Sequence, residues 1–175
     1  MWQILRQIAR TGIVTEAAPP TDDALRVEAV RIQEEILDAL GQALTIREVD
    51  AGSCNGCELE INAVNNPYYN LEGLGIRFVA SPRHADMLLV TGPVSRHMAE
   101  ALRRTYEATP EPKLVVAVGD CGCSGGIFGE SYASCGRVAA LIPVDVEVPG
   151  CPPAPIEILR GILAAVRRNA ATRKR

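Results

Sequence analysis

The sequence has few aromatic residues, only two histidines and no long apolar run. A membrane-spanning helix needs about 18 or more apolar residues in succession, so we expect that this polypeptide does not itself cross a bilayer. The segment from Met1 to Val14 also lacks the uninterrupted apolar core of a secretory signal, because Arg6 and Arg10 divide it. These absences predict a cytoplasmic protein.

A strong excess of one charge is also missing. The formal net charge is −3 and the isoelectric point is about 5.5, which excludes a general attraction to nucleic acid. The five basic residues between Arg167 and Arg175 are best explained as a solvated terminus. With 175 residues, 47% of them hydrophobic and 22% charged, the chain has the composition of one globular α/β domain.

The sequence divides into three parts. Residues 1–43 form a helical extension, in which Met1–Ile13 is an amphipathic helix that could contact a partner, a membrane surface or its own domain. A linker at Ala17–Thr21 precedes a second helix, which we expect to run from about Thr21 to Leu40. Residues 44–168 form the main domain, and residues 169–175 form the basic tail.

In the main domain, short apolar runs alternate with helix-length segments, a pattern typical of a parallel sheet with helices on both faces. The expected strands are Leu44–Val49, Ile76–Ala80, Met87–Thr91, Leu114–Val118 and Val144–Val148. The expected helices are Cys57–Val64, Ser95–Tyr106, Ser131–Ala140 and Ala154–Val166.

Three of these expected strands are followed closely by cysteine. Cys54 and Cys57 come after the first strand, Cys121 after the fourth and Cys151 after the fifth. Ligands of open parallel sheets bind beyond the carboxyl ends of the strands. Cysteines far apart in the sequence are therefore expected to meet at one edge of the sheet.

Four converging thiolates suit either an iron–sulfur cluster or a zinc ion. Structural zinc sites usually combine two Cys-x-x-Cys pairs, whereas only Cys54 and Cys57 form such a pair in this chain. The cysteine loops are also rich in glycine, which lets backbone N–H groups approach anionic sulfur. The spacing favours a cluster but leaves open zinc, redox-active thiols or simple burial.

Two further cysteines lie outside this set of four. Cys123 could replace Cys121 as a ligand, and Cys135 is expected on the helix after the glycine-rich loop. Burial as small apolar side chains is the simpler explanation for both. The glycine-rich loop lacks the spacing of a nucleotide-binding motif, and neither His84 nor His97 adjoins a cysteine as a catalytic base would.

Four motifs in this order resemble the cluster-bearing small subunit that is shared by energy-converting group 4 [NiFe] hydrogenases, formate hydrogenlyase among them, and respiratory complex I. They are Cys54-Asn-Gly-Cys57-Glu-Leu-Glu60, Ser81-Pro-Arg-His-Ala-Asp86, Gly119-Asp-Cys121 with Gly125-Gly126-Ile127-Phe128, and Pro143-Val-Asp-Val with Pro149-Gly-Cys151-Pro-Pro153. The similarity extends from about Ile46 to Val166.

The resemblance implies an α/β, flavodoxin-like, doubly wound parallel sheet without flavin, preceded by the N-terminal helical extension. It also implies one [4Fe–4S] cluster, and it selects Cys121 over Cys123 as the third ligand. The cofactor-binding and metal-ligand residues are then Cys54, Cys57, Cys121 and Cys151. No catalytic residue is expected in this chain, because the active site of such an oxidoreductase belongs to its large subunit. Glu60 matches an acidic position of the ligand motif.

The Cys-x-x-Cys pair resembles the hydrogenase branch, since complex I subunits carry two adjacent cysteines there. The resemblance implies a relay of electrons between a ferredoxin-like iron–sulfur subunit and a [NiFe] large subunit, in a complex with integral membrane subunits. The chain would then lie peripherally on the cytoplasmic side of the cell membrane. The alternatives are a complex I-like relay to quinone, a zinc-stabilised structural subunit and a flavodoxin-like carrier of FMN.

Overall fold

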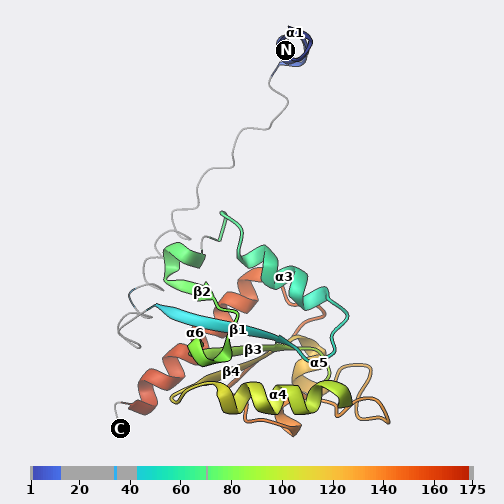
Figure 1. The fold of residues 1–175 in the computed structure, drawn as a ribbon, viewed down its shortest axis with the longest axis vertical. Coiled ribbons are helices and arrows are strands. Elements are labelled where there is room, and N and C mark those ends of the chain that lie inside the picture. The colour runs from blue at the N-terminus through green and yellow to red at the C-terminus, as the bar shows by residue number, and fades with distance from the viewer. Residues whose placement is uncertain (1, 13–33, 35–42, 70, 174–175) are drawn as a thin grey trace.

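The computed structural model describes residues 2–12, 34, 43–69 and 71–173, with side chains up to Arg168. Five strands form one parallel sheet in the order β2-β1-β3-β4-β5 (Figure 1). The strands are β1 (Leu44–Asp50), β2 (Ile76–Phe78), β3 (Met87–Thr91), β4 (Leu114–Val118) and β5 (Val146–Val148). This strand order is that of flavodoxin-like sheets, so the expected fold class is confirmed.

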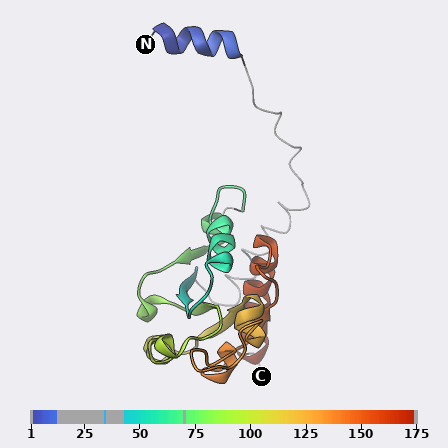
Figure 2. The ribbon, with the colours of Figure 1, turned by 90° about the vertical axis from the view of Figure 1, so that its right-hand side faces the viewer.

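Helices cover both faces of the sheet. Helices α3 (Gly56–Val64) and α6 (Pro155–Arg173) lie on one face, and α4 (Arg96–Ala108) lies on the other (Figures 1 and 2). A short helix, α5 (Gly119–Ser124), follows β4 directly. Single 3₁₀ turns occupy Leu71–Leu74, Pro82–His84 and Val138–Ala140.

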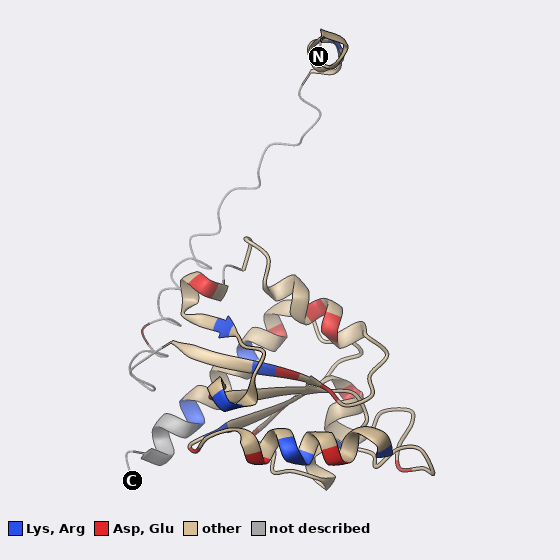
Figure 3. Cartoon of the chain, viewed as in Figure 1, with Lys and Arg blue, Asp and Glu red and all other residues tan. Residues whose placement is uncertain are grey.

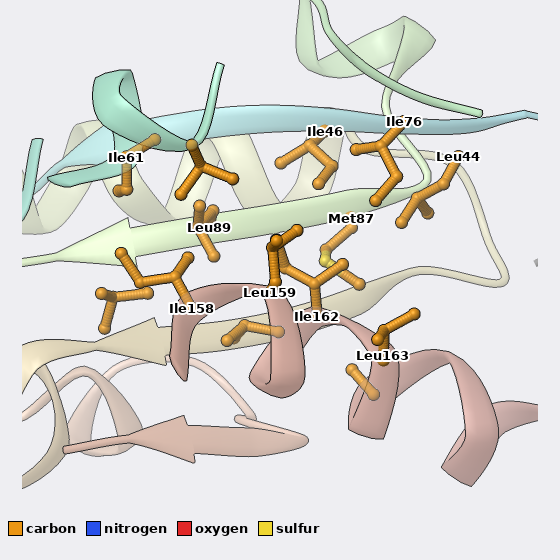
Figure 4. Close-up of a cluster of buried hydrophobic side chains, with 14 of the residues drawn as sticks. Leu44, Ile46, Ile61, Ile76, Met87, Leu89, Ile158, Leu159, Ile162 and Leu163 are labelled. Atoms are coloured by element: carbon orange, nitrogen blue, oxygen red, sulfur yellow. The ribbon is translucent and has the colours of Figure 1, made fainter. Parts of the chain in front are cut away.

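The larger part of the core lies between the sheet and helices α3 and α6 (Figure 4). On α6 the buried residues recur at helical spacing, which turns one stripe of this helix toward β4 and β5. Gly161 lets α6 approach β5 closely, because a Cβ atom at this position would collide with the side chain of Val148. The residues drawn and labelled are Leu44, Ile46, Ile61, Ile76, Met87, Leu89, Ile158, Leu159, Ile162 and Leu163.

The second part of the core lies on the α4 face. Leu102, the buried residue of α4, packs there with alternate residues of β1, β3 and β4, such as Val49, Leu88 and Val115. Strands β3 and β4 are buried along their whole length. This explains why they read in the sequence as continuous apolar runs rather than alternating ones.

The expected strands are all present, but the expected helix Ser131–Ala140 is wrong. The Ser131 hydroxyl oxygen accepts hydrogen bonds from the backbone N–H of Ala133 and Ser134, at 3.3 and 3.2 Å. The backbone N–H of Cys135 donates to the carbonyl of Val94 at 2.7 Å. These local and cross-chain bonds satisfy the backbone outside a helix. Cys135 therefore lies in an extended bridge with Glu130, not on a helix.

The N-terminal helix is present as α1, Trp2–Thr11. The linker at Ala17–Thr21 and the second helix expected from Thr21 to Leu40 lie outside the described residues. At the other end, the backbone of α6 continues through most of the basic tail, to Arg173. Within the described ranges, no helix has the length and apolar character needed to span a bilayer.

Candidate metal centre

The register of the sheet places the cysteine-bearing loops next to one another. Asp50 at the end of β1 pairs with Thr91 of β3, Thr91 pairs with Val118 of β4, and Val118 pairs with Val148 of β5. The strands that precede the cysteines therefore end at one level along the same edge. Cys54 follows β1 by four residues, whereas Cys121 and Cys151 follow β4 and β5 by three.

The pKa values of two of these cysteines are affected by the others. Burial, followed by the negative charge of Glu58, raises the pKa of the Cys57 thiol to about 12. The thiolates of Cys54, Cys121 and Cys151 add to this rise. The pKa of Cys121 is likewise raised by burial and then by the thiolates of Cys151 and Cys54. The fold thus brings together thiols that are up to 97 residues apart in the sequence.

The loop after β1 is shaped by Asp50. Its Oδ1 atom accepts hydrogen bonds from the backbone N–H of Gly52 and of Ser53, both at 2.8 Å. The hydroxyl oxygen of Ser53 then accepts from the backbone N–H of Asn55 at 3.0 Å. These consecutive side-chain turns carry the backbone past Cys54 and into the first turn of α3, which holds Cys57.

A pair of hydrogen bonds joins the other two cysteine loops. The backbone N–H of Asp120 donates to the carbonyl of Gly150 at 2.8 Å, and the backbone N–H of Gly150 donates to Oδ1 of Asp120 at 2.8 Å. Asp120 and Gly150 immediately precede Cys121 and Cys151. The spacing between the third and fourth cysteines is therefore set by this reciprocal pair.

Glycine leaves room around two of the sulfur atoms. A Cβ atom at Gly119 would lie 2.5 Å from Sγ of Cys57, and one at Gly126 would lie 2.8 Å from Sγ of Cys121. Both glycines also have positive φ, 84° and 55°, a conformation that other residues adopt at a cost. A larger residue at either position would displace a cysteine sulfur or the loop backbone.

A buried carboxylate adjoins the cysteines. Glu58 is only 7% exposed, its Oε1 atom accepts a hydrogen bond from the hydroxyl of Thr91, and its Oε2 atom has no hydrogen-bond partner among the described residues. The sequence analysis singled out Glu60, which is half-buried, and missed Glu58. The polar Thr91 at the end of the otherwise apolar β3 was the available signal.

The two surplus cysteines face other surroundings. Cys123 is buried in the core on the α4 face, and its thiol donates to the carbonyl of Ala117 with a sulfur–oxygen distance of 3.6 Å. Its pKa is raised to about 11 by burial and then by Glu147, with no contribution from another cysteine. Cys135 packs against the same core. Cys123 is buried, as the sequence analysis favoured, whereas Cys135 is only half-buried.

Arg83 and His84 lie away from the cysteines. They belong to the 3₁₀ turn that precedes Met87, at the amino end of β3, and both are exposed. The cysteine loops lie at the opposite, carboxyl ends of the strands. Both residues therefore lie in a solvated loop, away from the cysteine loops.

The donor types at this edge of the sheet fit an iron–sulfur cluster. Within the described ranges, no three His, Cys, Asp or Glu side chains gather tightly enough to hold one metal ion. A zinc ion requires four donors within about 2.0–2.3 Å of one point, whereas the thiolates of an iron–sulfur cluster bind separate irons. Four thiols on adjacent loops, two of them beside glycines, are the donors that such a cluster would need.

The fold defines a flavodoxin-like protein with four cysteines in the loops at the carboxyl edge of its sheet. Comparison with known proteins agrees. The model of the family described as NADH ubiquinone oxidoreductase, 20 Kd subunit, matches residues 54–165, and the chain belongs to this family. The expected resemblance is confirmed, as is the prediction of an oxidoreductase subunit.

Curated relatives extend the match. The chain is 47% identical over 131 residues to the probable membrane-bound hydrogenase subunit mbhJ of Pyrococcus furiosus, covering 75% of this chain and 78% of the relative. It is 42% identical over 135 residues to formate hydrogenlyase subunit 7 of Escherichia coli, covering 77% of this chain and 53% of the relative.

A solved structure is also similar. A chain of the membrane-bound sulfane sulfur reductase, an archaeal respiratory membrane complex, superimposes with a TM-score of 0.66 at 33% identity. The match covers 79% of this chain and 77% of that chain.

Proposed function

We propose that this chain is the electron-transfer subunit of a membrane-bound hydrogenase complex and holds one [4Fe–4S] cluster on Cys54, Cys57, Cys121 and Cys151. The observation that carries the proposal is the register of the sheet, which places the loops that hold these four cysteines next to one another at one edge. Cys123 is instead buried in the core, and Cys135 packs half-buried against it. When bound, such a cluster accepts and returns one electron at a time.

The protein residues around the thiols hold and tune the site. Asp50 and Asp120 order the three loops through their hydrogen bonds to backbone N–H groups. Glu58 adds a buried negative charge next to Cys57. Because a negative charge opposes the addition of an electron nearby, Glu58 would lower the reduction potential of the site.

Exposed apolar residues border the cysteine loops and supply a surface for the large subunit. Cys54 and Cys151 are exposed. The loop that follows Cys121 exposes Ile127 to 93% and Tyr132 to 95%, and α3 exposes Leu59. Large exposed apolar side chains near a redox site mark a protein contact. A hydrogenase-type large subunit on this surface would bring its catalytic centre near the cluster.

The names of two relatives support partners in a membrane complex. One is called a membrane-bound hydrogenase subunit and another belongs to a respiratory membrane complex. We therefore propose integral membrane subunits as the anchor. The family resemblance of the motifs adds a ferredoxin-like iron–sulfur subunit as the proposed electron-exchange partner. The chain itself would lie peripherally, on the cytoplasmic side of the membrane.

The hydrogenase branch is favoured over a complex I-like relay to quinone by two observations. The first cysteine pair has the Cys-x-x-Cys spacing of Cys54 and Cys57, and the hydrogenase and hydrogenlyase relatives each match about three quarters of the chain. The family description itself names a quinone-reducing enzyme, so quinone reduction is the second candidate.

Serine variants test the cluster and its ligands. Serine at Cys54, Cys57, Cys121 or Cys151 should lower the iron content and abolish the EPR signal of the reduced protein. The matched controls Cys123→Ser and Cys135→Ser should retain about four irons per chain. Full iron after Cys121→Ser, together with loss after Cys123→Ser, would overturn the ligand assignment, and zinc in place of iron would overturn the cluster.

Assays of the purified complex test the branch. A hydrogenase complex should contain nickel and evolve hydrogen from a low-potential donor, and its activity should not respond to quinone analogues. An intact complex that lacks nickel and reduces quinone would refute the hydrogenase assignment while leaving the cluster relay in place.

A further inference from the structure

Helix α1 exposes a complete apolar face. Trp2, Ile4, Leu5 and Ile8 are 83%, 64%, 56% and 62% exposed, and no residue of this helix is buried. At 3.6 residues per turn, these four side chains and Ala9 fall on one side of the helix.

The opposite face of α1 is polar and carries only positive charge. Arg6 and Arg10 are one turn apart and share this face with Gln3 and Gln7. The helix has no acidic residue (Figure 3). Elsewhere the described domain mixes both charges. This helix therefore combines an apolar face with a purely cationic one.

We propose that α1 binds directly to the surface of a bilayer that contains anionic lipid. A helix of ten residues is about 15 Å long, too short to cross a hydrocarbon core of about 30 Å. It can instead lie in the plane of the interface, with its apolar face among the acyl chains. Arg6 and Arg10 would then extend their charged ends outward to lipid phosphates.

Charge favours lipid over a protein groove as the occupant. A groove on a protein would contact the apolar side chains of α1 and leave its polar face in solvent. The polar face could then carry charges of either sign. An anionic bilayer instead attracts every positive charge near its surface and repels every negative one. The charges of α1 are all positive, as binding to an anionic bilayer requires. The proposal does not depend on the cluster, so it can fail or succeed separately from the proposed function.

Trp2 provides a direct probe, because it is the one tryptophan of the sequence. The full chain should float with vesicles of phosphatidylcholine mixed with phosphatidylglycerol, and its fluorescence should shift to shorter wavelength and resist quenching by acrylamide. Vesicles of phosphatidylcholine alone should bind much more weakly. Because the attraction is partly electrostatic, added salt should weaken binding to the mixed vesicles.

Paired asparagine variants separate the two faces of the helix. Ile8→Asn removes a large apolar side chain from the inserted face and should lower the partition coefficient at least about tenfold. Gln7→Asn introduces the same residue on the polar face and should leave it within about twofold. Arg6→Gln and Arg10→Gln should each lower it about fivefold on mixed vesicles.

Three results would overturn the proposal. Equal binding to neutral and anionic vesicles would show that the arginines do not contribute to binding. Shielding of Trp2 before vesicles are added, with no further change on their addition, would show that α1 packs on its own domain. Absence of vesicle binding by the full chain, with Trp2 shielded only in the assembled complex, would identify a partner protein as the occupant.

Discussion

Gly119 offers the sharpest test of the cysteine site, because its missing side chain faces a sulfur atom. An alanine Cβ at this position would lie 2.5 Å from Sγ of Cys57, whereas nonbonded heavy atoms prefer about 3.5–4.0 Å. Cys57 or the backbone of Gly119 must therefore move by about 1 Å or more. Metal–ligand distances tolerate only about 0.2 Å. We expect Gly119→Ala to lose most of its iron.

Gly75→Ala is the matched control. Gly75 has a φ of 75°, close to the 84° of Gly119, but a Cβ atom there would meet no atom within 4 Å. Both variants should lose about 1–2 kcal/mol from the left-handed backbone conformation. This corresponds to a fall in melting temperature of about 2–4 °C per kcal/mol for a chain of this size.

Iron content and EPR of the reduced protein, measured beside thermal unfolding of the iron-free protein, separate the two effects. Only Gly119→Ala should lose iron, although both variants are less stable. The reasoning would be refuted if Gly119→Ala kept four irons with an unchanged signal, or if Gly75→Ala lost iron to the same degree.

Two further predictions concern charge at the site. The pKa of Cys57 is raised from 9.0 to about 12 in the folded state, so above pH 9 the unfolded chain releases a proton that the folded chain retains. The free energy of unfolding of the iron-free protein, measured with urea, should therefore fall as the pH rises above 9. Cys57→Ser should make this fall less steep. An equally steep fall in the variant would contradict the assignment of the raised pKa to Cys57. Because the charge of Glu58 raises the pKa of Cys57, Glu58→Gln should move the midpoint of Cys57 alkylation by iodoacetamide to lower pH. Glu60→Gln, the control, should leave that midpoint unchanged. An unchanged midpoint in Glu58→Gln would show that Glu58 does not influence the pKa of Cys57.

Local sequence was sufficient for much of the architecture. The strands Met87–Thr91 and Leu114–Val118 were predicted with the bounds that the structure has, because buried parallel strands are continuous apolar runs with strong β propensity. The position of the cysteines just after strands predicted their convergence, since parallel strands place their carboxyl ends at one edge. Family motifs then supplied the choice of Cys121 over Cys123.

The tertiary structure decided what depends on contacts between distant segments. Ser131–Ala140 has the composition of a helix, yet its backbone bonds to Val94 and to nearby serine hydroxyls, partners that helical spacing does not reveal. The roles of Glu58 and Glu60 also could not be distinguished from sequence. Two carboxylates two residues apart on a helix point to different sides, and only the packing of α3 on the sheet determines that Glu58 is the one buried beside Thr91 and Cys57.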